Sequence, residues 1–235
     1  MTTKQKVAIV TGAGSGIGNA IAHRLVIEGY KVYGGDVSWP NVSDPDVSFS
    51  QIDCDVRKTD QVRALFSVCM DTEGSPDVLV NSAGVSGRWS IAKITDEEWA
   101  KVLDINLFGT FACMREAANI MSGQRSGRII NIASNRGLHG LKNGSPYAAS
   151  KGAVLALTKT GALELGSFNI GVFAILPGST DTPLLRGTRT DAQVAEIAAI
   201  GLNKPEHVAD AVIPFLSQNA LALNGACVSV ARRTL

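Results

Sequence analysis

Cysteine and histidine are scarce in this sequence, and the few that occur are scattered. No Cys-x-x-Cys pair is present, and the three histidines form no ligand-spaced cluster with the four cysteines, which are Cys54, Cys69, Cys113 and Cys227. Disulfide frameworks and metal sites both need closely spaced ligands or paired thiols. We therefore expect no metal site and no structural disulfide, and we interpret the cysteines as buried thiols.

An excess of charge of either sign is absent as well. The 235-residue chain has 22 basic and 21 acidic residues, interspersed along its length, for a net charge of +1. Nucleic acids and anionic membranes are bound by surfaces rich in Lys and Arg, so we expect neither as a partner. Residues 1–6 are polar, and the apolar run at 7–10 is too short for a signal peptide or a membrane span. These features predict a cytoplasmic protein that binds small molecules.

Hydrophobic residues make up 45% of the chain and charged residues 18%, which is typical of a compact globular domain. No internal repeat, low-complexity tract or shift in composition marks a second domain. Short apolar runs recur, mostly followed by turn signals and a helical pattern, at 7–10, 31–33, 77–80, 128–132 and 170–176. Runs without polar alternation favour parallel strands that are buried on both faces. The sequence therefore predicts one α/β domain over residues 1–235, a doubly wound parallel sheet of the Rossmann type.

Two helix starts accompany these runs. Thr95-Asp-Glu-Glu98 is a capping box that opens a helical pattern to about residue 121, and Ser145 followed by Pro146 predicts an N-cap and a first helical residue. Both helices carry more apolar and small residues than one buried face needs, which favours pairing of two copies across a two-fold axis. Packing of both helices on the sheet alone is the alternative.

Prolines interrupt two other segments. Two of them fall between Asp36 and Val47, where a doubly wound fold usually has a crossover helix, so we expect an irregular or very short connection there. Pro214 lies within the helical stretch that starts near Pro205, and it predicts a kink.

A glycine-rich turn, Thr11 to Gly18, follows the first apolar run and opens a helix to about residue 28. Its glycines allow backbone N–H groups to approach a pyrophosphate at a helix N-terminus. Asp36 ends the second run, where a carboxylate accepts hydrogen bonds from ribose hydroxyls and repels a 2′-phosphate. Binding NADP would call for a nearby cation, yet Ser15 and Val37 are uncharged. The pattern therefore predicts NAD, the alternative for Asp36 being an ordinary turn aspartate.

Tyr147 and Lys151 are four residues apart, which places them on one face of the helix that Pro146 opens. Ser134 follows the run at 128–132, at the carboxyl end of a predicted strand, where open α/β sheets bind ligands. A phenol has a pKa of about 10, and a neighbouring ammonium favours its phenolate. The three side chains therefore predict general acid-base catalysis. The alternative is that Tyr147 and Lys151 lie four residues apart by coincidence.

Six motifs in this order resemble the short-chain dehydrogenase/reductase family in its compact, single-domain form. They cover nearly the whole chain and are TGAGSGIG at 11–18, NSAG at 81–84, INLFG around Asn106, Ser134, YAASK at 147–151 and PGSTDT at 177–182. The resemblance implies reversible hydride transfer between NAD(H) and an alcohol or carbonyl substrate. It also implies that Ser134 orients the substrate oxygen, Tyr147 exchanges the proton, Lys151 holds the ribose, and Asn106 positions a water.

The same resemblance implies a set of cofactor-binding residues around the turn, the strand ends and the catalytic helix. They are Gly12, Ser15, Gly16, Ile17, Gly18, Asp36, Asp55, Val56, Asn81, Ala83, Gly84, Tyr147, Lys151, Pro177, Gly178 and Thr182. Two departures limit it: Ser82 replaces the family's usual second asparagine, and the ending 228–235 lacks the usual glycines. Because of the second departure, the resemblance does not predict the C-terminal part of the pocket.

Other functions remain as alternatives. A 3-oxoacyl-acyl-carrier-protein reductase is the runner-up, although such enzymes usually resemble NADP users with a basic residue near Ser15. A non-catalytic dinucleotide-binding protein would not need Ser134, Tyr147 and Lys151 together. Epimerases and dehydratases that use the same pair resemble a longer form with a separate substrate domain. The substrate itself is not encoded in any motif.

Three segments are expected to form the substrate pocket, at 85–92, 135–145 and 179–202. Within the last of them, residues 181–202 include Arg186, Arg189 and a helical pattern at 191–200. A connection of this length over the nicotinamide end of the site is typical of an active-site lid. We expect it to act as a substrate lid, and a solvated surface loop is the alternative.

Overall fold

The computed structural model describes residues 5–40 and 47–231. Within them seven parallel strands form one sheet, in the order β3-β2-β1-β4-β5-β6-β7. The strands are β1 (Val7–Thr11), β2 (Lys31–Asp36), β3 (Phe49–Asp53), β4 (Val78–Asn81), β5 (Gly127–Ile132), β6 (Ile170–Pro177) and β7 (Cys227–Val230). β1 pairs with β2 on one side and with β4 on the other. The strand order therefore changes direction at the boundary between β1 and β4, because β2 and β3 lie on one side of it and β5 to β7 on the other. The predicted doubly wound, single-domain Rossmann-type fold is confirmed, and such sheets bind ligands at this reversal.

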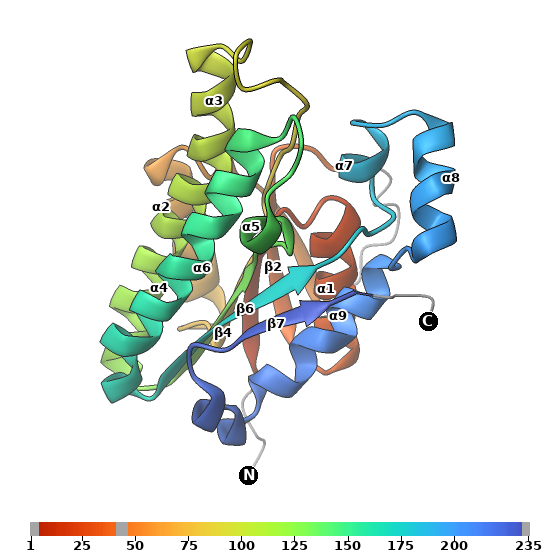
Figure 1. Ribbon diagram of the computed structural model, residues 1–235. Helices are drawn as coiled ribbons and strands as arrows, with labels where there is room; N and C mark the ends of the chain where they lie inside the picture. The colour runs from red at the N-terminus through yellow and green to blue at the C-terminus, as the bar shows by residue number, and fades with distance from the viewer. Residues whose placement is uncertain (1–4, 41–46, 232–235) are drawn as a thin grey trace.

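Helices cover both faces of the sheet (Figure 1). One face carries α1 and α9, and the other carries α2, α4 and α6 (Figure 1). The α-helices are α1 (Gly16–Ile27), α2 (Thr59–Thr72), α3 (Asp96–Leu103), α4 (Gly109–Gln124), α5 (Arg136–His139), α6 (Ser145–Leu165), α7 (Pro183–Arg186), α8 (Asp191–Ile200) and α9 (Pro205–Val212). A π turn forms η1 (Asp104–Phe108), and 3-10 turns form η2 (Gly166–Phe168), η3 (Ile213–Leu216) and η4 (Gln218–Leu223).

Two hydrophobic cores lie on the two faces of the sheet. Ile21 and Leu25 of α1 pack with Val208 and Val212 of α9 against one face, and all four side chains are fully buried. The second core is built in the same way from α2, α4 and the other face. Every residue of β1, β4, β5 and β6 is buried, which is why their sequences read as continuous apolar runs.

The predicted helix starts are correct for one helix and shifted for the other. Thr95 caps α3 with a capping box: its hydroxyl accepts the Glu98 N–H at 3.2 Å, and the Glu98 carboxylate accepts the Thr95 N–H at 3.0 Å. The pattern that follows forms α3, the π turn η1 and α4 in succession. At α6 the predicted N-cap is wrong by one residue, because Ser145 is already helical and Gly144 is the N-cap.

Two strands escaped the sequence analysis. β3 alternates between buried and exposed residues, and β7 is only partly buried, because each lies at an edge of the sheet. The connection after Asp36 begins without a helix over residues 37–40, as expected, and residues 41–46 lie outside the described part. α9 changes to a 3-10 turn one residue before Pro214, which accords with the predicted kink.

The described ranges leave out both ends of the chain. Residues 1–4 of the polar N-terminus and 232–235 of the atypical ending lie outside them. Among the helices formed by residues 5–40 and 47–231, none combines the length and the apolar character that a membrane crossing requires.

Candidate active site

A cavity of about 790 Å³ runs along the carboxyl edge of the sheet, a volume in the range of small-molecule sites. Asp36 and Asp55 line what we call its acidic end, and Arg136, Tyr147 and Arg189 line what we call its basic end. Of the predicted site residues, the wall includes Gly12, Ser15, Gly16, Ile17, Gly18, Asp36, Asp55, Val56, Ala83, Gly84, Ser134, Tyr147, Lys151, Pro177, Gly178 and Thr182. Asn81 and Asn106 are not among the lining residues.

The glycine turn lies beside Asp36 at the acidic end. Gly12 has a φ of +68°, and a Cβ there would come within 2.7 Å of the Ala83 nitrogen, so a side chain would collide with the neighbouring turn. Among the described residues, no side chain caps the first turn of α1, whose N-cap is Ser15. An uncapped helix N-terminus beside a side-chain-free turn fits the pyrophosphate of a dinucleotide.

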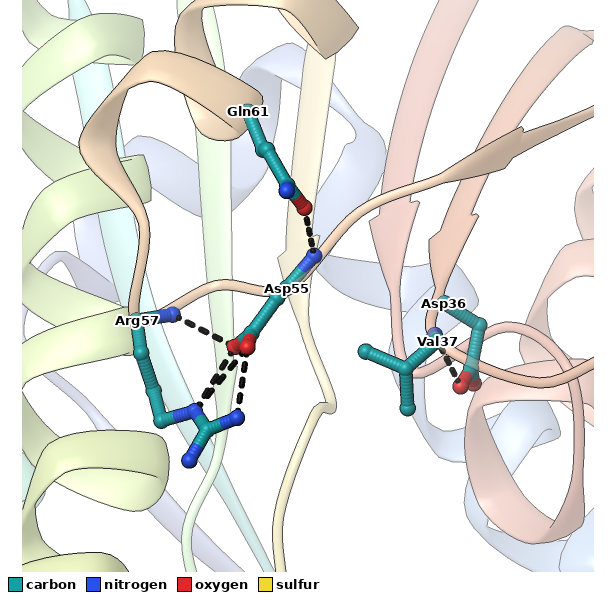
Figure 2. Close-up of polar contacts among 5 residues, drawn as sticks. All are labelled: Asp36, Val37, Asp55, Arg57 and Gln61. Carbon is teal, nitrogen blue, oxygen red and sulfur yellow. Dashed lines mark hydrogen bonds and ion pairs between the residues drawn. The ribbon is translucent and has the colours of Figure 1, made fainter.

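Asp36 holds the glycine turn against the end of β2. One carboxylate oxygen accepts the Gly14 N–H at 2.8 Å, and the other accepts the Val37 N–H at 2.7 Å and the Ser38 N–H at 3.2 Å. Figure 2 shows the contact with Val37. Carboxylate oxygens accept hydrogen bonds, so the three backbone N–H groups fix the position of the Asp36 side chain. The acidic end therefore carries a fixed negative charge beside the turn.

Asp55 and Arg57 form an ion pair at the same end of the cavity (Figure 2). The Arg57 Nε lies 2.9 Å from Asp55 Oδ1, and its Nη2 lies 2.6 Å from Oδ2. The Asp55 N–H donates to Gln61 Oε1 at 2.8 Å. The hydrogen bond from Arg57 lowers the pKa of Asp55. Arg57 lines the cavity but was missed by the sequence analysis. Its two-residue spacing from Asp55 was the available signal.

Ser134, Tyr147 and Lys151 meet at the basic end. Ser134 lies two residues beyond β5, while Tyr147 and Lys151 are one turn apart on α6. The Lys151 Nζ donates to the Ile132 carbonyl at 2.7 Å and lies 6.0 Å from the centroid of the Tyr147 ring. Because Lys151 is almost fully buried, its pKa falls to about 8. The sequence analysis predicted this grouping.

The environment of the Tyr147 hydroxyl differs in one respect from the expected one. Burial raises the pKa of Tyr147, while its hydrogen bond with Ser134 and the positive charges of Arg136 and Arg189 lower it. Among the side chains, the sequence analysis assigned the supporting charge to Lys151. Arg136 lies in the predicted pocket segment at 135–145, but the sequence analysis did not single it out because a single arginine after a strand carries no motif.

Asn106 and Asn81 lie behind the cavity wall. The Asn106 side chain accepts the Val85 N–H at 2.8 Å, donates to the Val85 carbonyl at 3.0 Å, and donates to Ser150 Oγ at 3.1 Å. It thereby fastens the segment after β4 to α6. Asn81 donates to Asn131 Oδ1 at 2.9 Å and so links β4 to β5.

The departure at position 82 leaves the turn intact. The Ser82 N–H, a backbone group, donates to the Thr11 carbonyl at 3.2 Å and lies 3.2 Å from the Thr11 hydroxyl. The Ala83 N–H is 3.4 Å from the same hydroxyl. Since the contacts use the backbone, the change from asparagine to serine does not remove them.

The ends of β6 and β7 complete the wall. Gly178 donates its N–H to the Val230 carbonyl at 2.8 Å, and the Thr182 hydroxyl caps α7 by accepting the Leu185 N–H at 3.2 Å. Ser229 also lines the cavity, and its hydroxyl donates to Asn135 Oδ1 at 2.8 Å. The chain therefore forms this part of the pocket without the family's usual glycine-rich ending.

The first part of the connection at 181–202, residues 182–185 and 188–189, lines the cavity. The whole connection contains α7 and the predicted helix at 191–200, which is α8. Leu184, Leu185 and Arg189 line the cavity, whereas Arg186 does not. Arg186 instead pairs with Asp181, its Nε 2.7 Å and its Nη2 2.8 Å from the two carboxylate oxygens. The two arginines of this segment thus have different surroundings.

Comparisons with known proteins agree with this geometry. The family model described as short chain dehydrogenase matches residues 6–193. The acetoacetyl-CoA reductase of Acinetobacter sp. is 34% identical over 242 residues, which cover 97% of each chain. The 3-oxoacyl-acyl-carrier-protein reductase of Thermotoga maritima is 32% identical over 98% of each chain. A crystal structure of an actinorhodin polyketide ketoreductase variant with NADPH superposes with a TM-score of 0.88 at 32% identity, covering 98% of this chain and 97% of that one.

Proposed function

The chain belongs to the short chain dehydrogenase family, and we propose that it transfers hydride between NAD(H) and an alcohol or carbonyl substrate. The observation that carries the proposal is the convergence of Ser134, Tyr147 and Lys151 on the same cavity as the glycine turn. A nicotinamide cofactor bound there supplies hydride to a carbonyl or accepts it from an alcohol. A small alcohol or carbonyl compound is therefore the expected partner.

Proton transfer falls to Tyr147 in this proposal. In the reducing direction the Tyr147 hydroxyl gives its proton to the carbonyl oxygen as hydride reaches the carbon, and in the oxidising direction the phenolate takes the proton back. The Ser134 hydroxyl donates a hydrogen bond to the same oxygen, which favours the charge that develops on it. The cations Arg136 and Arg189 support the phenolate. General acid-base help of this kind contributes roughly 10²–10⁴-fold to the rate.

Cofactor holding is divided among the remaining predicted residues. The turn at 12–18 would hold the pyrophosphate, with Asp55 and Val56 at the adenine and Ala83 and Gly84 along the adenosine. Lys151 would bind the nicotinamide ribose hydroxyls, and Pro177, Gly178 and Thr182 the carboxamide. Asn81 would brace the sheet at this site, and Asn106 would position a water for proton relay. Apart from these two asparagines and residues 13 and 14 of the turn, all of them line the cavity.

The preference for NAD over NADP rests on charge at the acidic end. The Asp36 carboxylate disfavours a 2′-phosphate, and the nearby guanidinium of Arg57 is already paired with Asp55. An added phosphate would meet repulsion and would have to break an ion pair to gain a partner. The neighbour with bound NADPH makes NADP the runner-up.

A second candidate is a 3-oxoacyl-acyl-carrier-protein reductase. It is favoured by the relative of that name, which matches over nearly its full length. The uncharged Ser15 and Val37 weigh against it, since NADP use is expected of that type. A non-catalytic dinucleotide-binding protein is disfavoured by the intact Tyr147 and Lys151.

Activity profiling tests the proposal. The purified protein is assayed with NAD⁺ and NADP⁺ against secondary alcohols, diols and hydroxy acids, and with the reduced cofactors against the matching carbonyl compounds. Turnover with NAD(H), well above that with NADP(H), is expected. Absence of turnover with both cofactors across the panel would contradict an oxidoreductase, and a preference for NADP(H) with acyl thioesters would favour the second candidate.

Two further features belong to the proposed enzyme. The segment at 181–202 would act as a lid that closes on substrate, with Thr182 and Gly187 near its hinge.

The exposed apolar residues Phe108, Phe111 and Leu163 lie on η1, α4 and α6. Pairing across a two-fold axis would cover them in a homodimer or homotetramer. Light scattering that shows a monomer at micromolar concentration would contradict the assembly.

A further inference from the structure

Three arginines from separate segments gather at the basic end of the cavity. Arg88 follows β4, Arg136 opens α5, and Arg189 follows α7. Arg136 and Arg189 line the cavity itself, and Arg88 is held beside them by donating from Nη1 to the Lys142 carbonyl at 2.8 Å. Their charges also act on one another, because burial and the charges of Arg88 and Arg136 lower the pKa of Arg189.

Negative charge is missing from this end of the cavity. Among the described residues, no carboxylate lies within ion-pair distance of Arg88, Arg136 or Arg189. The carboxylates in the described lining are Asp36 and Asp55, both at the acidic end. Like charges held together in a partly desolvated site are unfavourable unless an anion joins them. The arrangement is therefore incomplete without a ligand of negative charge.

We propose that Arg136 and Arg189 bind an anionic group of the substrate, a carboxylate or phosphate close to the reacting carbonyl, with Arg88 adding charge behind them. A guanidinium binds either group through paired hydrogen bonds. Because both arginines act on the Tyr147 hydroxyl, the anionic group lies near the carbonyl that Tyr147 protonates. An acyl thioester on a phosphopantetheine arm carries its phosphate many bonds from its carbonyl and does not fit this spacing. This inference rests on the proposed function, because it assumes that Tyr147 protonates the substrate carbonyl beside the arginines.

Arg186 provides a matched control in the same segment. It is three residues from Arg189, but it is paired with Asp181 and lies outside the cavity wall. Arg189→Gln and Arg136→Gln remove a cation from the basic end, whereas Arg186→Gln removes one from the surface. All three residues are at least partly exposed, so each variant should fold.

The first test measures binding without turnover. The cofactor-free protein is titrated calorimetrically with malonate, whose two carboxylates suit two guanidinium groups. Arg189→Gln and Arg136→Gln should each weaken binding about tenfold, the effect of losing one charge-assisted hydrogen bond, while Arg186→Gln should bind as wild type does. Binding at the glycine turn is common to all four proteins and does not affect the comparison. Equal affinity in wild type and Arg189→Gln would overturn the proposal.

The second test compares turnover of charged and neutral substrates. NADH-dependent kcat/KM is measured for acetoacetate against its methyl ester, and for dihydroxyacetone phosphate against dihydroxyacetone. The kcat/KM of a charged compound should exceed that of its neutral partner at least about tenfold, and Arg189→Gln should abolish the difference. The pair that shows the difference identifies the bound group as a carboxylate or a phosphate. Equal or better use of the neutral members would refute the anion site and leave the oxidoreductase standing. No turnover of any compound would count against the oxidoreductase, and the malonate titration would then decide the anion site alone.

Discussion

The two ends of the cavity are built in contrasting ways. The acidic end uses backbone groups and a carboxylate: the glycine turn, the uncapped start of α1, and Asp36 held by three backbone N–H groups. The basic end uses side chains from distant segments, with Tyr147 and Lys151 on α6 and the arginines on three other connections. We therefore expect the acidic end to recognise a constant part of the cofactor through the fold itself, and the basic end to recognise a substrate through replaceable side chains.

The contrast also separates charge along the cavity. The acidic end already pairs its lining guanidinium, Arg57, with Asp55. At the basic end Arg136 and Arg189 remain without a carboxylate among the described residues. A dinucleotide without a 2′-phosphate would avoid repulsion at the acidic end, and a substrate with an anionic group would meet complementary charge at the basic end.

The largest effect is expected from Tyr147→Phe. Loss of the hydroxyl should lower kcat by roughly 10²–10⁴-fold, because proton transfer to the carbonyl is removed. The dissociation constant for NADH, measured by fluorescence titration, should change little. Tyr30→Phe is the matched control, since Tyr30 is buried outside the cavity lining. Near-normal kcat in Tyr147→Phe would show that another group transfers the proton.

Lys151→Met should stabilise the cofactor-free protein while it abolishes function. Burial lowers the pKa of Lys151 from 10.5 to about 8, so keeping the ammonium buried at pH 7 costs about 3 kcal/mol. Losing the charge-assisted hydrogen bond to the Ile132 carbonyl gives back about 2 kcal/mol, which leaves a gain of about 1 kcal/mol in the free energy of unfolding.

The stabilising effect of Lys151→Met should depend on pH. Between pH 8 and 10.5 the unfolded wild type binds more protons than the folded form, so wild-type stability from this group rises with pH. Urea unfolding of both proteins should therefore show the gap closing over that window. Lys159→Met, on an exposed residue of the same helix, should show neither effect. A variant less stable than wild type at pH 7 would contradict the buried-charge account.

A smaller effect is expected in the backbone of the basic end. With NADH and a substrate analogue bound, hydrogen exchange in residues 181–202 should slow as the proposed lid closes, while NADH alone should protect the glycine turn first. Mass spectrometry of peptides from both regions gives the comparison directly. Unchanged exchange at 181–202 in the ternary complex would indicate a solvated loop instead.

The sequence predicted some parts of the structure better than others. Local rules were enough for the glycine turn, Asp36 and the Tyr147–Lys151 pair, because each depends on neighbouring residues and a strand or helix start. The edge strands β3 and β7 were missed because partial exposure breaks up their apolar pattern. Arg88 and Arg136 lie in the predicted pocket segments at 85–92 and 135–145 but were not singled out, because they meet Arg189 only through tertiary packing, which no spacing along the chain encodes.

The most direct test of the charge separation along the cavity needs no substrate. Fluorescence titration of the purified protein with NADH and NADPH measures recognition at the acidic end alone. The account predicts that wild type binds NADH at least about tenfold more tightly than NADPH, and that Asp36→Ala narrows this ratio as repulsion of the 2′-phosphate is removed. Equal affinity for the two cofactors, or tighter binding of NADPH by the wild-type protein, would contradict it.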